Sequence, residues 1–383
     1  MKTIYLDNAA TSFPKPPAVS QRMAAYLEQV GATVNRSSYG TAQEAEWTAL
    51  RLRQRLGRMF HFPDPSHVVL TPGNTMGLNL VLRGFLKPGD HCLVSSMEHN
   101  AVMRPLHDLS AMGVEVDRIP CDGKGRLNPA DIPARLRPNT KLLVLAHGSN
   151  VSGAVQDAEA VGKVCRQSGI AFCLDAAQTA GHIPVDFQQF GLSALSVPGH
   201  KGLLGPSGIG ALLLSPDFAA QLIPIITGGT GSTSDLEVQP DRMPDRFESG
   251  TPNIPGIYGL EASMAFLEET GIERVMVHDR ELTARLLDGL RGIPSIRIVG
   301  PETVKDRVGV VSVEFLHLDN ADAADRLEQE FGILTRCGLH CAPAAHKTLG
   351  TFPQGTVRFS LGWYTTEAEV DAAAAAVRAI SEG

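Results

Sequence analysis

The sequence predicts an α/β protein: a large domain with a mostly parallel sheet, and a second, smaller α+β domain. Short apolar runs alternate with helical spacing from residue 43 to about residue 214, which is typical of α/β units. The run Leu142–Ala146 is apolar throughout, as expected for a strand buried on both faces of a parallel sheet. From about residue 260 onward, helices and strands no longer alternate, which indicates a smaller α+β domain.

The first helix is indicated by Ala49, Leu52 and Leu56, which recur at helical spacing. Later helices should begin near Thr75 and Asn100, and another should span about Glu159 to Gln167. The strands of the large domain are expected at Val68–Leu70, Cys92–Val94, Val114–Ile119, Leu142–Ala146, Ile170–Leu174, Ala194–Val197 and Ile209–Leu214.

The segment from Gly228 to Asn253 is rich in Gly, Pro, Ser and Asp and predicts a long irregular stretch. Loops of that length in compact proteins are usually functional. After it, helices are expected at Ile257–Glu269, Glu273–Leu290, Ala321–Phe331 and Glu367–Ile380, and strands at Ile296–Val299, Val308–Phe315 and Val357–Ser360.

Composition and charge exclude several classes of function. The chain has 383 residues with 34 basic and 41 acidic side chains, a net charge of −7, so it lacks the basic surface that binds nucleic acid or anionic membranes. No apolar run approaches the roughly 18 residues of a membrane span. The first seven residues lack the apolar core of a signal peptide, and six cysteines imply no disulfide framework. We therefore expect a cytoplasmic protein.

Polar side chains follow five of the predicted strands. They are Gly73-Asn74-Thr75, Glu98-His99-Asn100, His147 with Ser149 and Asn150, Asp175 with Gln178, and Gly199-His200-Lys201. Ligands of open parallel sheets bind at the carboxyl ends of the strands, and convergent polar groups mark a site. One such group alone would be explained as a cap or a turn.

Pyridoxal phosphate (PLP) chemistry fits these residue types. Lys201 lies among glycines and apolar residues, where a desolvated amine can form a Schiff base. Asp175 could keep a pyridinium nitrogen protonated. The helix that follows Gly73 could bind a phosphate on its first N–H groups. His99 could stack on the ring and Gln178 could donate to the phenolic oxygen.

The ordered set of motifs resembles the class V aminotransferases among the fold type I PLP-dependent transferases, and within them the short-loop cysteine desulfurases and selenocysteine lyase-like enzymes of the Suf type. The matching stretches are Leu6–Thr11, Glu98–Pro105, Ser149–Gly153, Asp175–Gln178, Gly199–Lys201, Phe247–Asn253, Arg336–Ala342 and Val357–Leu361. The resemblance implies a large PLP-binding domain over residues 17–259 and a small domain made of residues 1–16 and 260–383.

The resemblance also implies a role for each matched residue. Lys201 would hold the cofactor as a Schiff base, and Cys341 would form a persulfide. The cofactor-binding residues would be Asn74, Thr75, His99, Asn150, Asp175, Gln178, His200, Lys201 and, across the interface of a homodimer, Thr251. The substrate-binding residues would be Asn150, Arg358, Arg36 and His340, with Arg358 gripping the substrate carboxylate through two hydrogen bonds.

The sequence departs from the family pattern near the cofactor and near the thiol. Pro198 stands where a hydroxyl side chain often donates to the phosphate, and Cys337 is an extra thiol four residues before Cys341. Cys341 could also be an inert buried thiol, or could join Cys337, His340 and His346 at zinc. The neighbouring His340 and Arg336 favour a reactive thiol instead, and we expect no metal.

The sequence leaves the following functions open. The leading expectation is a PLP-dependent cysteine desulfurase that converts L-cysteine to L-alanine and passes sulfur to an acceptor protein or a small molecule. The alternatives are a selenocysteine lyase acting on L-selenocysteine, an aminotransferase or β-lyase in which Cys341 is idle, and a PLP-holding scaffold protein.

Overall fold

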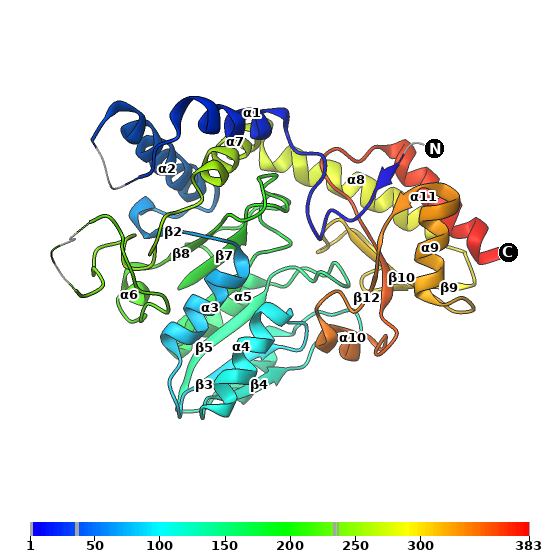
Figure 1. Ribbon diagram of the computed structural model, residues 1–383. Coiled ribbons are helices and arrows are strands. Elements are labelled where there is room, and N and C mark those ends of the chain that lie inside the picture. Colours follow the sequence, from blue (N-terminus) through cyan, green and yellow to red (C-terminus); the bar gives the residue numbers. More distant parts are fainter. Residues whose placement is uncertain (1–2, 35–37, 233–234, 236, 383) are drawn as a thin grey trace.

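Two large sheets, one short two-stranded sheet and the helices that cover them make up the described part of the chain. The computed structural model describes residues 3–34, 38–232, 235 and 237–382. The larger sheet lies between α3 and α4 on one side and α7 on the other, and the smaller sheet lies beside it, next to α9 and α11 (Figure 1). In the described residues, the larger sheet has seven strands in the order β2-β8-β7-β6-β5-β3-β4.

The large sheet confirms the predicted α/β class. Its strands are β2 (Val68–Thr71), β3 (His91–Ser95), β4 (Glu115–Ile119), β5 (Thr140–Ala146), β6 (Ala171–Asp175), β7 (Ala194–Pro198) and β8 (Gly210–Leu214). The strand β8 is antiparallel to both of its neighbours, β2 and β7, and the other pairs are parallel. The six strands other than β8 therefore run in one direction, and their carboxyl ends lie at one edge of the sheet.

Alternate side chains of each central strand pack against different helices. Leu142 and Val144 of β5 pack against α3 (Asn74–Phe85) and α4 (Asn100–Ala111). Leu143 and Leu145 face the other way. There they meet α2 (Gly40–Met59), α5 (Ala158–Ser168) and α7 (Ile254–Thr270). This double burial explains the uninterrupted apolar run of β5.

The second sheet has four antiparallel strands in the order β12-β13-β10-β9 in the described residues. They are β9 (Ile296–Val299), β10 (Val310–Phe315), β12 (Arg336–Gly338) and β13 (Thr356–Ser360). Its apolar face packs against α8 (Ile272–Leu290), α9 (Asn320–Phe331) and α11 (Glu367–Glu382). Because side chains alternate along a strand, Val357 and Phe359 of β13 join this core, and Arg358 lies on the opposite face, toward the large sheet.

The N-terminal segment connects the two sheets. The strand β1 (Ile4–Tyr5) pairs in parallel with β11 (Ile333–Leu334), and α1 (Pro17–Ala25) packs against α7. The remaining short elements are α6 (Pro216–Ala219), α10 (Pro343–Leu349), a π-helical turn (Tyr26–Val30) and single 3₁₀ turns at Pro65–His67, Pro129–Asp131 and Pro133–Arg135. Among the described residues, no helix combines the length and the apolar character that crossing a membrane requires.

Candidate active site

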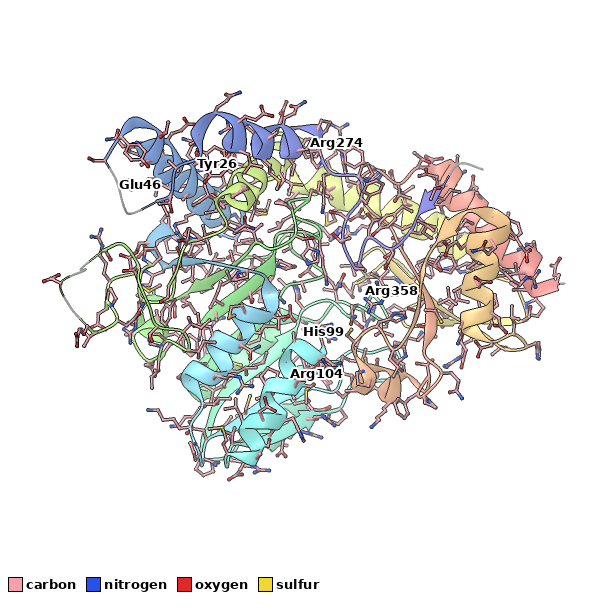
Figure 2. All side chains as sticks on the ribbon, viewed as in Figure 1. Tyr26, Glu46, His99, Arg104, Arg274 and Arg358 are labelled. Atoms are coloured by element: carbon pink, nitrogen blue, oxygen red, sulfur yellow. The ribbon has the colours of Figure 1, made fainter. Side chains whose placement is uncertain are left out.

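A cavity of about 230 Å³ lies at the carboxyl ends of the parallel strands. Figure 2 shows His99 and Arg358 near each other in the middle of the molecule, between the two sheets. The predicted residues that line the cavity are Asn74, Thr75, His99, Asn150, Asp175, Gln178, His200, Lys201 and Arg358. The common direction of β2, β3, β5, β6 and β7 brings most of these residues together, as the strand-end argument expected.

Lys201 follows β7, and Asp175 ends the neighbouring strand β6. Burial lowers the pKa of Lys201 to about 8, and Asp175 opposes that change. Burial raises the pKa of Asp175, and this rise is opposed by hydrogen bonds to its Oδ1 from the Ala177 N–H (3.0 Å) and the Asn74 amide (2.8 Å). A cation beside Asp175 would stabilise its ionised form.

His99 is the N-cap of α4, and its Nδ1 accepts a hydrogen bond from the Ala101 N–H at 3.0 Å. This bond fixes the plane of the ring. Burial, followed by the charges of Lys201 and Arg336, lowers the pKa of His99 to about 4, so the imidazole is neutral near pH 7. Gln178 uses its amide nitrogen to donate to the Ala9 carbonyl at 3.1 Å, which leaves the second N–H of that amide free to donate.

The site for an anion lies at the start of α3. Gly73 is the N-cap and contributes no side chain to cap the helix, so the first N–H groups of α3 are available to a ligand. The ring Nδ1 of His200 and the amide Oδ1 of Asn74 are buried without a hydrogen-bond partner. Pro198, which also lines the cavity, has no N–H to contribute.

Arg358 projects from β13 into the cavity and is 1% exposed. Its Nη2 donates to the Asp7 carboxylate at 2.6 Å and its Nη1 donates to the Asn150 carbonyl at 3.1 Å. Its Nε is buried with no hydrogen-bond partner. The side-chain amide of Asn150 donates to the His340 carbonyl at 2.6 Å.

Cys341 lies on the loop between β12 and α10 and is exposed. The Arg336 guanidinium, which lines the cavity, donates to its sulfur at 3.4 Å. The Asn100 N–H of α4 donates to its carbonyl at 2.9 Å. His340 and Cys341 both have left-handed backbone conformations, with φ of 48° and 58°, so the chain turns sharply at the thiol. The thiol therefore lies beside the cavity on a loop that contacts α4 and the small sheet.

The structure does not bring every predicted residue to the cavity. His340 is buried and hydrogen-bonds to the Thr356 hydroxyl at 3.0 Å, and burial lowers its pKa to about 2. It therefore supplies no positive charge to the neighbouring thiol. Cys337 packs against the helix-covered core of the small sheet, on the face of β12 opposite Arg336. Among the described residues, no group of three or more His, Cys, Asp or Glu side chains could hold a metal.

Thr251 and Arg36 also lie apart from the cavity. Thr251 is exposed and lines a separate cavity of about 260 Å³ together with Pro72 and Met76. Arg36, which we expect near the substrate, falls outside the described residues.

Several residues that contribute to the cavity have no role in the sequence-based expectations. Ala9, Ala10 and Met97 line it, and Asp7 holds Arg358. For Asp7, Ala9 and Ala10, the one sequence feature that points to the site is their place in the matched stretch Leu6–Thr11. The sequence shows Arg336 as a neighbour of Cys341, but its position in the wall of the cavity follows from its place on β12, opposite Arg358.

Comparisons with known proteins agree with this geometry. Residues 4–373 match the family model described as aminotransferase class-V. A probable cysteine desulfurase from Methanothermobacter thermautotrophicus is 32% identical over 96% of this chain and 92% of its own length. The apo structure of a cysteine desulfurase from Thermococcus onnurineus superimposes with a TM-score of 0.93 at 31% identity, covering 100% of this chain and 95% of the other.

A cysteine desulfurase from Escherichia coli, in an S-sulfonic acid form, superimposes with a TM-score of 0.88 at 29% identity, covering 99% of this chain and 95% of that one. The residues matched by the family model, 4–373, include both large sheets and the loop that carries Cys341. The chain described here belongs to the aminotransferase class-V family.

Proposed function

We propose that this protein is a PLP-dependent cysteine desulfurase that converts L-cysteine to L-alanine and leaves a persulfide on Cys341. The observation that carries the proposal is the placement of an exposed thiol, bound by Arg336, beside a cavity that contains Lys201. The reaction of an aminotransferase uses no thiol, so that function would not explain an exposed cysteine at this position. The names of the relatives support the same reaction.

The residues of the cavity fit PLP. Among the described residues, the side-chain nitrogen of Lys201 makes no hydrogen bond or ion pair. Two buried polar atoms near the start of α3, His200 Nδ1 and Asn74 Oδ1, also lack partners. A phosphate would meet Thr75, His200 and the first N–H groups of α3. A pyridinium nitrogen would meet Asp175, and the neutral ring of His99 would stack on the cofactor. When bound, PLP supplies an electron sink for the α-carbon of the substrate.

The chain's own groups orient the substrate and move its proton. Arg358 and Asn150 would hold the carboxylate. Lys201 Nζ, with a pKa of about 8, can take the proton of the α-carbon at neutral pH. The Cys341 sulfur attacks the substrate sulfur, an S–S bond forms, and the carbon–sulfur bond breaks. The electron pair of the broken bond stays with the β-carbon, which is protonated, and Lys201 Nζ returns its proton to the α-carbon. L-cysteine plus the Cys341 thiol thus gives L-alanine plus the Cys341 persulfide.

Cys341→Ala tests the nucleophile. We expect alanine release from L-cysteine to fall by about 10³-fold, since an essential nucleophile is lost. Cys337→Ala is the matched control and should be close to wild type, because Cys337 faces the core. Mass spectrometry should find one added sulfur on Cys341 after turnover. Full activity in Cys341→Ala would refute the proposal.

The same variant separates sulfur from selenium chemistry. Selenide leaves carbon more easily than sulfide, so a selenocysteine lyase needs less help from a thiol. If Cys341→Ala loses alanine release from L-cysteine but retains it from L-selenocysteine, Cys341 serves the sulfur reaction. A wild type active on L-selenocysteine alone would favour the lyase.

We also propose that the enzyme is a homodimer. Trp47 is 60% exposed and Ile226 is 52% exposed. Large apolar side chains that gather on a surface mark an interface. Trp47 lies in a cavity of about 740 Å³ between α2 and the irregular segment near Met243. A partner there would bring Thr251 toward the phosphate of the other subunit. Thr251→Ala should then weaken PLP retention without unfolding the protein. Full PLP retention in that variant would contradict the role of Thr251.

Three further assignments accompany the proposal. We propose that residues 17–259 form the cofactor-binding domain and that residues 1–16 and 260–383 form the small domain, although α7 crosses that boundary as one continuous helix. The exposed Cys341 would pass its sulfur to an acceptor. All six cysteines are free thiols, which suits a cytoplasmic location.

A further inference from the structure

The N-terminal segment contributes a carboxylate to the site, and its position suggests a role in substrate binding. Asp7 follows β1 and forms a bridge with Ser360 of β13, next to Arg358. Its backbone carbonyl accepts from the Tyr5 hydroxyl at 3.1 Å and from the Ala10 N–H at 3.0 Å. These contacts fix the backbone of Asp7 independently of the ion pair between its side chain and Arg358.

Arg358 donates to two acceptors, one from each of its terminal nitrogens. Asp7 Oδ1 accepts from Nη2 at 2.6 Å and the Asn150 carbonyl accepts from Nη1 at 3.1 Å. Two bonds in different directions define the plane of the guanidinium. An arginine has five N–H donors, so these bonds leave donors free, among them the buried and unpartnered Nε. A substrate carboxylate can bind to the free donors while Asp7 remains bound.

We propose that Asp7 is a positioning residue that orients Arg358 for the α-carboxylate of the amino-acid substrate. The inference rests on the proposed function, which makes that substrate an amino acid. Asp7 neutralises one charge, but Arg336 remains as a cation in the wall of the cavity. Positive charge for the substrate carboxylate is thus retained, and the contribution of Asp7 is the fixed direction of the donors.

The test compares two ligands that differ only in the carboxylate. PLP-loaded wild type, Asp7→Ala and Asp7→Asn are titrated with L-alanine and with ethylamine, and the change in visible absorbance gives an apparent Kd. Asp7→Ala should raise the Kd for L-alanine by about tenfold, the loss expected for a disturbed charged contact, and the Kd for ethylamine by less than about twofold. Asp7→Asn keeps an acceptor oxygen and should give a smaller rise for L-alanine.

The control is Asp371→Asn, which breaks an Arg–Asp pair with Arg285 on the exposed surface and should change neither Kd. With L-cysteine, Asp7→Ala should raise KM and leave kcat within about twofold. If Asp7→Ala does not fold, the near-isosteric Asp7→Asn replaces it, and its Kd values for L-alanine and ethylamine are compared in the same way.

Two results would overturn the inference. Equal weakening for L-alanine and ethylamine would show a structural role, and tighter binding of L-alanine would show that Asp7 competes with the substrate. The inference and the proposed function can fail separately, because binding of L-alanine requires no sulfur chemistry. Suppose that the wild type releases no alanine from L-cysteine, but Asp7→Ala weakens the binding of L-alanine and not of ethylamine. That result would refute only the desulfurase activity.

Discussion

At the scale of single residues, the amine of Lys201 makes the most direct prediction. Its pKa is lowered to about 8 by burial, and only a neutral amine adds to an aldehyde. As pH rises toward 8, the rate of PLP uptake by the cofactor-free protein should therefore increase about tenfold per pH unit. Above pH 8 the rate should level off. The measurement is the growth of the visible band between pH 6 and pH 10, with Lys201→Ala as the blank. A rate still rising past pH 9.5 would indicate an ordinary lysine.

His147 predicts a pH dependence of stability. It is buried, its Nδ1 lies 3.0 Å from the Thr179 hydroxyl, and burial lowers its pKa to about 4. In the unfolded chain the pKa is about 6.5. Below pH 6.5 the unfolded state therefore binds a proton that the folded state does not, so the free energy of unfolding falls as pH decreases toward 4. Over the 1.5 units from pH 6.5 to pH 5 this amounts to about 2 kcal/mol.

Urea denaturation of His147→Gln measures this contribution. Between pH 7 and pH 5 the wild type should lose about 2 kcal/mol more of its unfolding free energy than the variant loses. His107→Gln, at an exposed position on α4, should follow the wild type. Parallel pH curves for wild type and His147→Gln would contradict the assignment.

At the scale of elements, the loop between β12 and α10 depends on the contact between His340 and Thr356. Thr356→Val leaves a buried ring nitrogen unpaired, which costs about 1–3 kcal/mol of unfolding free energy. Because Asn150 also binds the His340 carbonyl, alanine release should slow while PLP uptake stays unchanged. Urea denaturation and the two assays measure these effects, and Ser20→Ala, an exposed hydroxyl, is the control. Unchanged stability in Thr356→Val would show that the loop does not need this contact.

Elements with a clear apolar pattern could be predicted from the sequence, and the others could not. The run at Leu142–Ala146 marks β5 within two residues. By contrast, α10 has seven residues and β12 has three, too few for any period to show. The position of α10 depends on distant contacts, such as those of Ala345 with Met97 and the core around them.

The site was predictable where it follows strand ends and not where it joins the two sheets. Asp175 and Lys201 end or follow adjacent parallel strands, so their proximity follows from the alternation of elements. Asp7 and Arg358 are 351 residues apart, and no local pattern links them. Cys337 and Cys341 look alike in sequence. The alternation of side chains along β12 directs Cys337 to the core, and the sharp turn after β12 leaves Cys341 exposed.

At the scale of the whole molecule, the exposed apolar side chains predict the oligomeric state. Trp47→Asp introduces a charge into the proposed interface, so the protein should sediment as a monomer and retain less PLP. Analytical ultracentrifugation gives the mass, and Met112→Asp is the control, because Met112 is equally exposed (61%) but lies at the end of α4, away from α2. A dimer that survives Trp47→Asp would place the interface elsewhere.

The pairing of β1 with β11 has a consequence for synthesis on the ribosome. Ile4 and Tyr5 leave the exit tunnel well before their partners Ile333 and Leu334, which follow more than 300 positions later. At about 5–20 residues per second, β1 waits roughly 20 to 60 seconds for that strand. During this interval Asp7 has no arginine to bind and the wall of the cavity is incomplete. The large sheet can form while translation continues, whereas a complete pocket for the amino acid arises only once translation has passed β13.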